Sequence, residues 1–306
     1  MTDYPTTPKI GELESADKPE RRSRAGESLW RRSLRSFLRS RYGMLGLVIV
    51  SLLVALALFA NFLAPYTPQR LFYGEELVPP SGTHLLGTDI VGRDVFSFVV
   101  YGTRAAFMVA FIAVGEAALI GLVIGACAGY FGGRVDNVLM RLTDVILVTP
   151  IMFLLIVAVS LFSIRTVAIT AVIIGLFIWP YFARIVRSEF LYYRNAMFVD
   201  AARTLGANDF RIIVFHILPN ALPSLIVTVT TYVAYAILTE AGLSFIGLGD
   251  PSAVTWGVML NVGRDVLRVA PWVVTFPGLM IFITTWAFNL MGDGLRDALD
   301  VKTVDL

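Results

Sequence analysis

Long apolar runs separated by short polar segments form the main pattern of this chain. A helix needs about 20 mostly apolar residues to cross a bilayer, and six segments of roughly that length are present. They are residues 44–66, 105–131, 145–164, 167–183, 212–239 and 269–292. A tight turn around Ser163 and Arg165 joins the third to the fourth. The pattern predicts an all-α membrane protein with six transmembrane helices.

Composition supports this assignment to a membrane. Of the 306 residues, 57% are hydrophobic and 16% are charged, whereas soluble domains are about half apolar and a quarter charged. The net charge of +2 indicates no nucleic-acid partner. The single cysteine, Cys127, lies inside an apolar run and is expected to be a small packing residue. No apolar core followed by a cleavage site opens the chain, so no removable signal peptide is expected.

Lys and Arg residues predict the orientation, because the cytoplasmic loops of membrane proteins carry an excess of them. With the amino terminus inside, 19 of the 25 Lys and Arg residues fall on the cytoplasmic side and 6 on the other. Both termini are therefore predicted to be cytoplasmic. The same count places the segment 184–215 on the cytoplasmic side.

The amino-terminal region divides into two parts. Residues 1–27 are polar and lack periodicity, which predicts a disordered cytoplasmic tail. Residues 28–43 predict a basic amphipathic helix that lies along the anionic inner leaflet, with arginines around an apolar face. Membrane lipid is favoured over nucleic acid as the partner of this helix, because the first span follows it directly. The apolar face holds Trp30, Leu34, Phe37 and Leu38.

Three outer-side residues have expected local roles. Asp94 is expected to cap a short helix that leads into the second span, since Asp is a frequent first residue before a helix. Trp256 and Trp272 are expected at the outer membrane interface, where amphipathic rings settle.

The segment 200–219, "DAARTLGANDFRIIVFHILP", is polar at its start and apolar at its end. Its first residues contain no helix breaker, and Val199, Ala202 and Leu205 or Gly206 fall near one face at helical spacing. Glycine commonly ends helices because it takes left-handed geometry without penalty, so the first helix is predicted to end at Gly206.

The second half of this segment predicts another helix. Asn208 or Asp209 can cap it, and it then runs through apolar residues into the bilayer. The alanines make the first helix thin, which suits insertion into a groove on another protein. A capped helical hairpin that only joins two spans remains the alternative from these residues alone.

The whole pattern resembles the "EAA" loop of ATP-binding-cassette (ABC) transporter permeases. That loop has an acid, two alanines, a glycine four residues beyond the second alanine, and a later Leu-Pro. Here these residues are Asp200, Ala201, Ala202, Gly206, Leu218 and Pro219. The acid is Asp where the family has Glu, which keeps the charge, and His216 replaces the usual Ile.

Other segments carry the same resemblance, over residues 45–300. Taken in order, these motifs are similar to those of the "C" permeases of dipeptide, oligopeptide and nickel importers. They are "HLLGTDIVGRDVFSFVVYGTRAAF" (84–107), "GGRVDNVLMRLTDVILVTP" (132–150), "EAGLSFIGLGDPSAVTWGVML" (240–260) and "FNLMGDGLRDALD" (288–300).

The resemblance implies a type I ABC importer permease fold with a cytoplasmic coupling helix that docks on an ATPase. The implied order is a first transmembrane helix (44–66), an extracytoplasmic loop with a short helix (67–104), a five-helix core (105–300) with the EAA loop at 198–219, and a cytoplasmic tail (301–306). The implied coupling residues are Asp200, Ala201, Ala202, Arg203, Leu205, Gly206 and Phe210.

The resemblance also implies a gate near the outer end of the fifth span. Its segment is glycine-rich and apolar, which lets backbones approach closely. Simple close packing is the alternative for this segment. The implied gate residues are Glu240, Leu243, Phe245 and Ile246.

Charges inside spans are costly and therefore point to function. Glu116 lies near the middle of the second span. It either lines the translocation pathway, where it would meet a cationic group, or faces the bundle as a protonated or hydrogen-bonded carboxylate. Asp144 follows Arg141 by one helical turn at the start of the third span, which favours a local ion pair or a helix cap.

Chemistry on this chain is expected to be limited to transport. None of the three lysines, Lys9, Lys18 and Lys302, follows a glycine-rich phosphate-binding loop of the form GxxxxGK[ST], so this chain cannot carry that ATP site. The two histidines, His84 and His216, are predicted on opposite membrane faces, so a shared metal site is not expected. No convergent set of catalytic groups indicates an enzyme.

By resemblance, the partners are a second homologous permease in a heterodimer, two cytoplasmic ATPase subunits and an extracytoplasmic solute-binding protein, in the cell membrane of a prokaryote. ATP and Mg²⁺ would bind to the ATPase subunits, with no cofactor on this chain. The rival from another class is a proton-coupled secondary transporter that uses Glu116. Inverted repeats would favour it, and none is seen. The solute, whether peptide, nickel or oligosaccharide, stays open.

Overall fold

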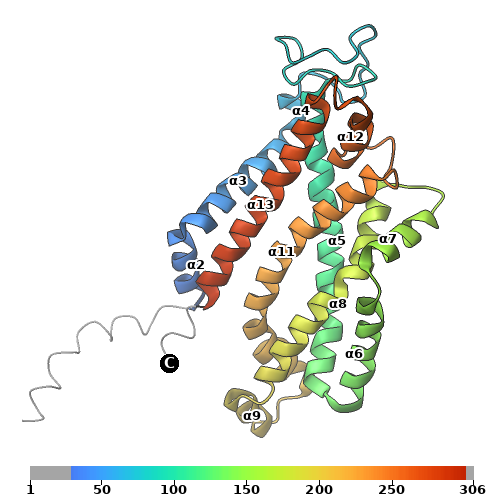
Figure 1. Ribbon diagram of the computed structural model, residues 1–306. Helices are drawn as coiled ribbons and strands as arrows, with labels where there is room; N and C mark the ends of the chain where they lie inside the picture. The colour runs from blue at the N-terminus through green and yellow to red at the C-terminus, as the bar shows by residue number, and fades with distance from the viewer. Residues whose placement is uncertain (1–28, 301–306) are drawn as a thin grey trace, which may run out of the picture.

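The computed structural model of the chain describes residues 29–300, so the predicted tails 1–27 and 301–306 lie outside the described residues. Helices form most of the described part (Figure 1). They are α2 (Leu29–Arg39), α3 (Arg41–Leu58), α4 (Ala60–Leu63), α5 (Val95–Phe131), α6 (Gly133–Val148), α7 (Ile151–Ser160), α8 (Val167–Tyr193), α9 (Met197–Thr204), α10 (Asp209–Arg211), the π-helix η1 (Ile212–Ile217), α11 (Leu218–Phe245), α12 (Trp256–Gly263), the 3₁₀-helix η2 (Arg264–Val266) and α13 (Trp272–Asp300).

Five of the helical segments in this part are long and apolar enough to cross a membrane, or six if the bent pair α6–α7 is one span. The all-α prediction with six spans is thus confirmed, but the third span is not straight. The axes of α6 and α7 meet at 84°. Pro150 causes this break, because proline lacks an N–H and forces the preceding Thr149 into an extended conformation with ψ 132°.

Several helices run beyond the apolar segments that predicted them. Helix α5 begins at Val95, so the short helix predicted within 67–104 is the start of the span itself. Asp94 caps it as predicted, and its carboxylate accepts a hydrogen bond from the Ser97 N–H at 2.8 Å. Helix α8 continues to Tyr193, ten residues past the apolar run. Hydropathy marks the part of a helix that contacts lipid, whereas caps mark its ends.

The centre of the bundle is the packing of α5 against α8, which cross in the middle of Figure 1. Gly121, Gly125 and Gly129 recur every four residues on the face of α5 that meets α8. Small residues at this spacing allow helices to approach closely within a membrane. Phe182 and Phe190 of α8, both fully buried, cover this face.

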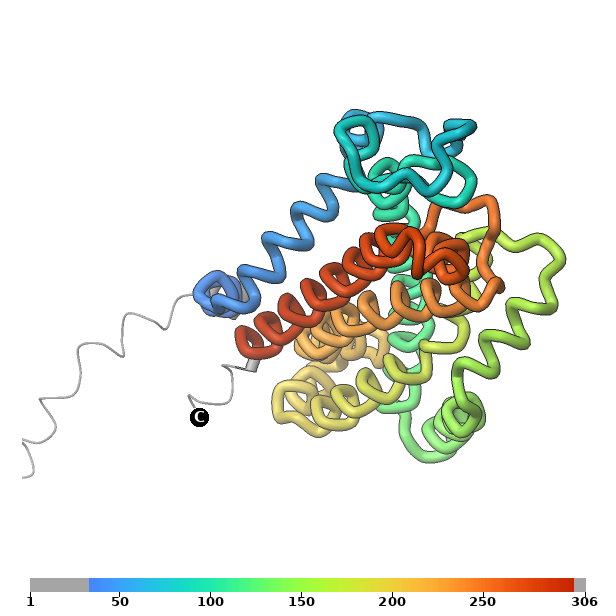
Figure 2. The backbone as a smooth tube through the Cα atoms, turned by 45° about the horizontal axis from the view of Figure 1, so that its top comes forward, coloured from blue at the N-terminus to red at the C-terminus, as the bar shows by residue number. Residues whose placement is uncertain are grey.

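The remaining long helices extend this centre on one side. Helix α11 packs on α8, α13 runs along the other side of α11, and α3 packs along α13 (Figure 2). A glycine contact joins α3 to α13, since Gly43 and Gly294 lie against each other. The bundle therefore has the close helix contacts that a membrane protein needs in the absence of a strong hydrophobic drive between helices.

The amphipathic helix predicted for 28–43 ends earlier, at Arg39, because the Ser40 side chain caps α3 by accepting a hydrogen bond from the Gly43 N–H at 3.2 Å. Its apolar face is also divided. Leu34 and Leu38 are exposed, whereas Phe37 is buried against Gly43 and Gly294. One aromatic ring thus anchors α2 to the bundle.

The loop of residues 64–94 forms a cap at the end of the bundle opposite α9 (Figure 1). His84 is its buried centre, with Nδ1 2.9 Å from Asp94 and Nε2 2.9 Å from Glu75. Burial alone would lower the pKa of His84, but the hydrogen bonds and charges of the two carboxylates outweigh it and raise the pKa. His84 therefore ties this loop to the first turn of α5 through its contact with Asp94, which caps that helix.

The two tryptophans of this end are anchored by hydrogen bonds. Trp256 is buried against Gly102 of α5 and donates its Nε1–H to the Val99 carbonyl at 3.0 Å, so its ring packs inside the bundle, and its place at the level of the membrane interface stays a prediction. Trp272 donates to the Thr88 carbonyl at 3.0 Å.

Candidate functional site

A short helical hairpin projects from the end of the bundle that is opposite the 64–94 loop. Helix α9 ends at Thr204, and Gly206, two residues further on, has a φ of +82° in the left-handed region. The Gly206 N–H donates to the Arg203 carbonyl at 2.9 Å and the Ala207 N–H to the Ala202 carbonyl at 3.1 Å. This pair of bonds is a Schellman motif, which satisfies the last carbonyls of a helix. The prediction that Gly206 terminates this helix is confirmed.

The return helix of the hairpin is capped as predicted. The Asn208 side chain accepts a hydrogen bond from the Arg211 N–H at 2.9 Å and so begins α10. Helix α10 passes without interruption into the π-helix η1 and then α11. The hairpin is therefore joined by continuous helix to a membrane span.

The hairpin buries one narrow face and exposes the rest. Val199 and Ala202 are buried, with α9 packed on the η1 segment. Leu205 is 88% exposed, so its predicted place beside Val199 is wrong. Six residues along a helix turn a side chain about 120° away from the starting face, because only the third, fourth and seventh positions return to it.

The exposed surface of the hairpin combines apolar and charged groups. Met197, Leu205 and Phe210 are three large apolar side chains exposed within 14 residues. Exposed apolar groups that gather in this way mark interaction sites. Asp200 and Arg203 form an exposed ion pair at 3.3 Å between them. Of the predicted coupling residues, only Ala202 is buried.

The last turn of α5 is attached to the hairpin through Tyr130. Its hydroxyl donates a hydrogen bond to Asp209 Oδ1 at 2.6 Å, and the Arg203 guanidinium lies 5.8 Å from the centre of its ring. We call the first of these contacts the Tyr130–Asp209 link. Sequence reasoning missed Tyr130, because 79 residues separate it from Asp209 and no motif includes it.

Ion pairs fix α6 against α8 near the same end. Arg187 holds Asp136 with two parallel hydrogen bonds of 2.5 and 2.6 Å. Arg184 pairs with Asp144 at 2.7 Å. The predicted pair between Arg141 and Asp144 is therefore wrong, since the guanidinium of a neighbouring helix takes this carboxylate.

The predicted gate residues do not share one surface. Glu240 is buried and accepts a hydrogen bond from the Ser244 hydroxyl at 2.6 Å, and Leu243 is fully buried. Phe245 and Ile246 are instead exposed. A role of these residues as a gate stays a prediction.

Glu116 of α5 lies half-buried against the backbone of α8 at Gly175. Within residues 29–300, no side chain forms a hydrogen bond or an ion pair with its carboxylate. The same part of the chain holds no group of three or more His, Cys, Asp or Glu placed to bind a metal ion.

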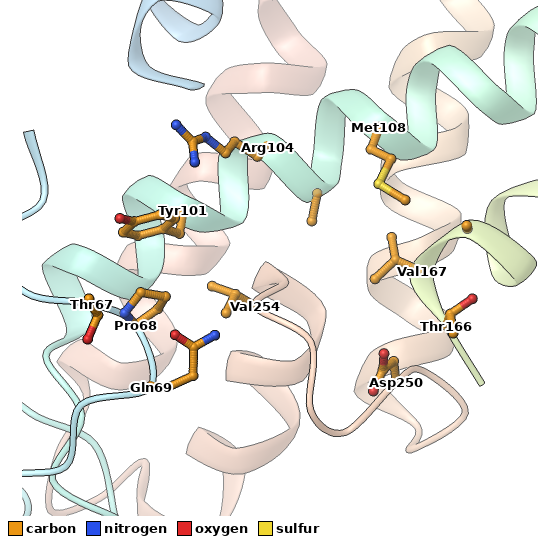
Figure 3. A pocket seen from close by; sticks show the side chains of 12 residues that line it. Thr67, Pro68, Gln69, Tyr101, Arg104, Met108, Thr166, Val167, Asp250 and Val254 are labelled. Carbon is orange, nitrogen blue, oxygen red and sulfur yellow. The ribbon is translucent and has the colours of Figure 1, made fainter. Parts of the chain in front are cut away.

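A cavity of about 530 Å³ opens at the loop end, between residues 67–69, α5, the start of α8 and the 250–254 segment (Figure 3). Arg104 turns away from it toward α3 and α4, where its guanidinium donates to the Ala57 carbonyl at 2.6 Å and to Asn61 at 2.9 Å. The cavity is thus lined by both polar and apolar side chains, and the Arg104 guanidinium does not point into it.

Two protein-family models match most of the chain. Residues 121–304 match the family described as binding-protein-dependent transport system inner membrane component. Residues 28–80 match the N-terminal transmembrane domain of oligopeptide transport permease C.

Curated relatives match over almost their whole length. The glutathione transport system permease protein GsiD of Pectobacterium atrosepticum is 39% identical, over 94% of this chain and 96% of the relative. The oligopeptide transport system permease protein OppC of Bacillus subtilis is 38% identical, over 94% of each. The dipeptide transport system permease protein DppC of Alkalihalophilus pseudofirmus is 36% identical, over 99% of this chain and 96% of the relative.

A solved structure supports the fold. The inward-facing MetNI methionine ABC transporter has a chain that aligns with 66% of this chain and 97% of its own length, with a TM-score of 0.53 and 20% identity. Both the family match and the relatives at 36–39% identity identify the same class of membrane protein. The chain belongs to the binding-protein-dependent transport system inner membrane component family, the non-enzymatic permease subunits of ABC importers.

Proposed function

We propose that this permease forms half of a translocation pathway for peptides and that its α9 hairpin receives the movement of an ATPase subunit. The relatives named above, which carry peptide or glutathione transport in their names, support the solute class. The surface of the hairpin supports the coupling role, and this observation carries the proposal: Met197, Leu205 and Phe210 are exposed on a rigid, capped helix pair.

The family implies an ATPase and a substrate-binding partner. We propose that a second, different permease completes the pathway, and that two ATPase subunits bind ATP and Mg²⁺. The hairpin end and both termini face the cytoplasm in this proposal, since 19 of the 25 Lys and Arg residues fall on that side. The binding protein then meets the 64–94 loop. The proton-coupled alternative gains no support from the relatives.

The geometry offers two routes for the movement. ATP closes the ATPase pair and carries the docked hairpins together. The first route runs from α9 through η1 into α11 by continuous helix. The second runs through the Tyr130–Asp209 link into α5. The spans then rock to receive solute from the binding protein, and hydrolysis returns them.

A crosslinking experiment tests the docking. Leu205→Cys in a Cys127→Ala background puts one thiol on the hairpin, because Cys127 is the single native cysteine. A short bifunctional reagent is expected to join this thiol to an ATPase subunit in the assembled transporter. Tyr73→Cys is the matched control, since Tyr73 is 86% exposed in the loop at the opposite end.

The same two variants test the orientation. A membrane-impermeant maleimide is expected to label the Tyr73→Cys variant in intact cells and the Leu205→Cys variant only after lysis. Capture of the ATPase through Tyr73→Cys, or by neither variant, would overturn the proposal.

We expect Tyr130→Phe to weaken the coupling between ATP hydrolysis and transport. The substitution removes the hydrogen bond to Asp209 and keeps the ring against Arg203. A hydrogen bond to a charged group contributes roughly 1.5–3 kcal/mol. The solute imported per ATP is expected to fall severalfold in reconstituted vesicles, with the amount of assembled complex unchanged.

Tyr192→Phe is the control for this variant. Tyr192 is exposed at the end of α8, and its hydroxyl has no hydrogen-bond partner among the described residues. Equal import per ATP in both variants would show that the Tyr130–Asp209 link does not transmit the movement of the hairpin to α5.

A further inference from the structure

Two tyrosine hydroxyls lie deep inside the membrane spans. Tyr181 is the 15th of the 27 residues of α8, and Tyr232 is the 15th of the 28 residues of α11. At a rise of 1.5 Å per residue, each lies about 20 Å along its helix from Val167 or Phe245, the ends near the 64–94 loop. A hydrocarbon core is about 30 Å thick, so the pair lies within it.

These residues form part of an aromatic cluster between α8 and α11. The ring centres of Tyr181 and Tyr232 are 5.4 Å apart, and Tyr235 lies 5.8 Å from Tyr232. Phe182 packs against the cluster, with its ring centre 5.0 Å from that of Tyr232. We call Tyr181, Tyr232 and Tyr235 the tyrosine platform. All three are half-buried.

The hydroxyls of Tyr181 and Tyr232 are unpaired but accessible. Neither forms a hydrogen bond within the described part of the chain. Among the described residues, the fully buried side-chain polar atom without a hydrogen-bond partner is Thr284 Oγ1. Because the two tyrosine hydroxyls also lack a partner but are not fully buried, each must reach an accessible surface. Their surroundings therefore leave room for a partner outside this chain.

Lipid is a poor occupant of that surface. An unpaired hydroxyl in an apolar medium costs free energy, and tyrosine in membrane proteins usually places its hydroxyl at the interface. Arg184, three residues beyond Tyr181 on α8, is exposed and paired with Asp144 at 2.7 Å. A wet pathway explains two unpaired hydroxyls at this depth inside the spans.

The chemistry of the platform points to an amide-rich solute without a large net charge. Each phenol can donate and accept a hydrogen bond, as the N–H and C=O of a peptide bond require. The ring faces suit side chains of varied shape. The platform contains no carboxylate, imidazole or thiolate, which a divalent cation would need. The adjacent charges of Arg184 and Asp144 neutralise each other.

We propose that Tyr181 and Tyr232 bind the main-chain amides of a peptide as it crosses the pathway. This inference rests on the proposed function as a peptide importer, and it names the chemistry that contacts the solute inside the span. Binding through the main chain makes the contact independent of sequence. The platform is thus suited to varied peptides, with selection left to the binding protein.

The test uses the complete transporter with its partner permease, ATPases and binding protein in vesicles. The variants are Tyr181→Phe, Tyr232→Phe and the double variant, which remove hydroxyls and keep the rings. Uptake of labelled tri-alanine is expected to fall roughly fivefold for each hydroxyl lost. Stimulation of the ATPase by the loaded binding protein is expected to stay unchanged. Tyr42→Phe, an exposed tyrosine of α3, is the control.

A second substrate separates binding from structure. Tri-alanine with N-methylated amides lacks main-chain donors, so the native transporter is expected to import it more slowly. The double variant is expected to lose this discrimination, which a merely structural effect would not do. Equal uptake of tri-alanine in all variants would overturn the platform. Failure of the native transporter to import any peptide would overturn the proposed function, and the platform with it.

Discussion

Gly206→Pro is expected to abolish solute import while the permease still inserts and accumulates. Gly206 has a φ of +82°, whereas proline is fixed near −65°. Proline also removes the N–H that donates to the Arg203 carbonyl. The turn must therefore reorganise and re-aim Leu205 and Phe210 away from the ATPase. Uptake by vesicles is expected to fall at least tenfold.

A graded series makes this prediction sharper. No atom lies within 4 Å of a Cβ placed on Gly206, so side-chain size alone has no effect there. Gly206→Ala carries the left-handed strain of roughly 1–2 kcal/mol, and Gly206→Asn carries less because Asn tolerates that conformation. Uptake is expected to decrease in the order Asn, Ala, Pro. Import by the Pro variant at the native rate would exclude a coupling role for the turn.

Gly125→Leu is expected to prevent accumulation of the permease altogether. A Cβ on Gly125 would lie 2.5 Å from the Ala183 carbonyl oxygen and 3.0 Å from the Arg187 nitrogen. These are backbone atoms of α8, so the two helices would have to separate. The loss of stability is expected to exceed the roughly 1–3 kcal/mol of ordinary overpacking.

Gly115→Leu is the matched control for this prediction. Gly115 lies on the same helix, and nothing lies within 4 Å of a Cβ placed on it. Leucine is also a better helix former than glycine. Immunoblots of membranes are expected to show the Gly115→Leu variant at the native level and the Gly125→Leu variant strongly reduced. Similar levels of both would mean that α5 and α8 do not depend on this close approach.

Local signals in the sequence predicted the parts of the fold that local chemistry determines. Apolar length was enough to find the spans, and the left-handed preference of glycine was enough to end α9 at Gly206. Hydropathy could not place the start of α5 at Val95, because a cap rather than lipid sets that end. The break at Pro150 could have been expected from the proline itself, but not its angle, which depends on packing.

The errors concern contacts between distant segments. The sequence predicts an ion pair between Asp144 and the nearest arginine along the chain, whereas in the fold Asp144 pairs with Arg184 of α8. Tyr130 carried no motif, and only the meeting of α5 with the hairpin revealed its hydrogen bond to Asp209. The platform was missed for the same reason, since Tyr181 and Tyr232 are unremarkable until two spans bring them together.

The glycine contacts between α5 and α8 also restrict how this permease can change shape. Glycines bring the backbones of α5 and α8 into contact, so neither helix can shift or rotate against the other without a steric clash. The two helices therefore move as one rigid unit. Rearrangement during a transport cycle must then occur at softer joints. Two such joints are the ion pairs between α6 and α8 and the tyrosine platform between α8 and α11. Long or flat side chains can shift there while they stay in contact.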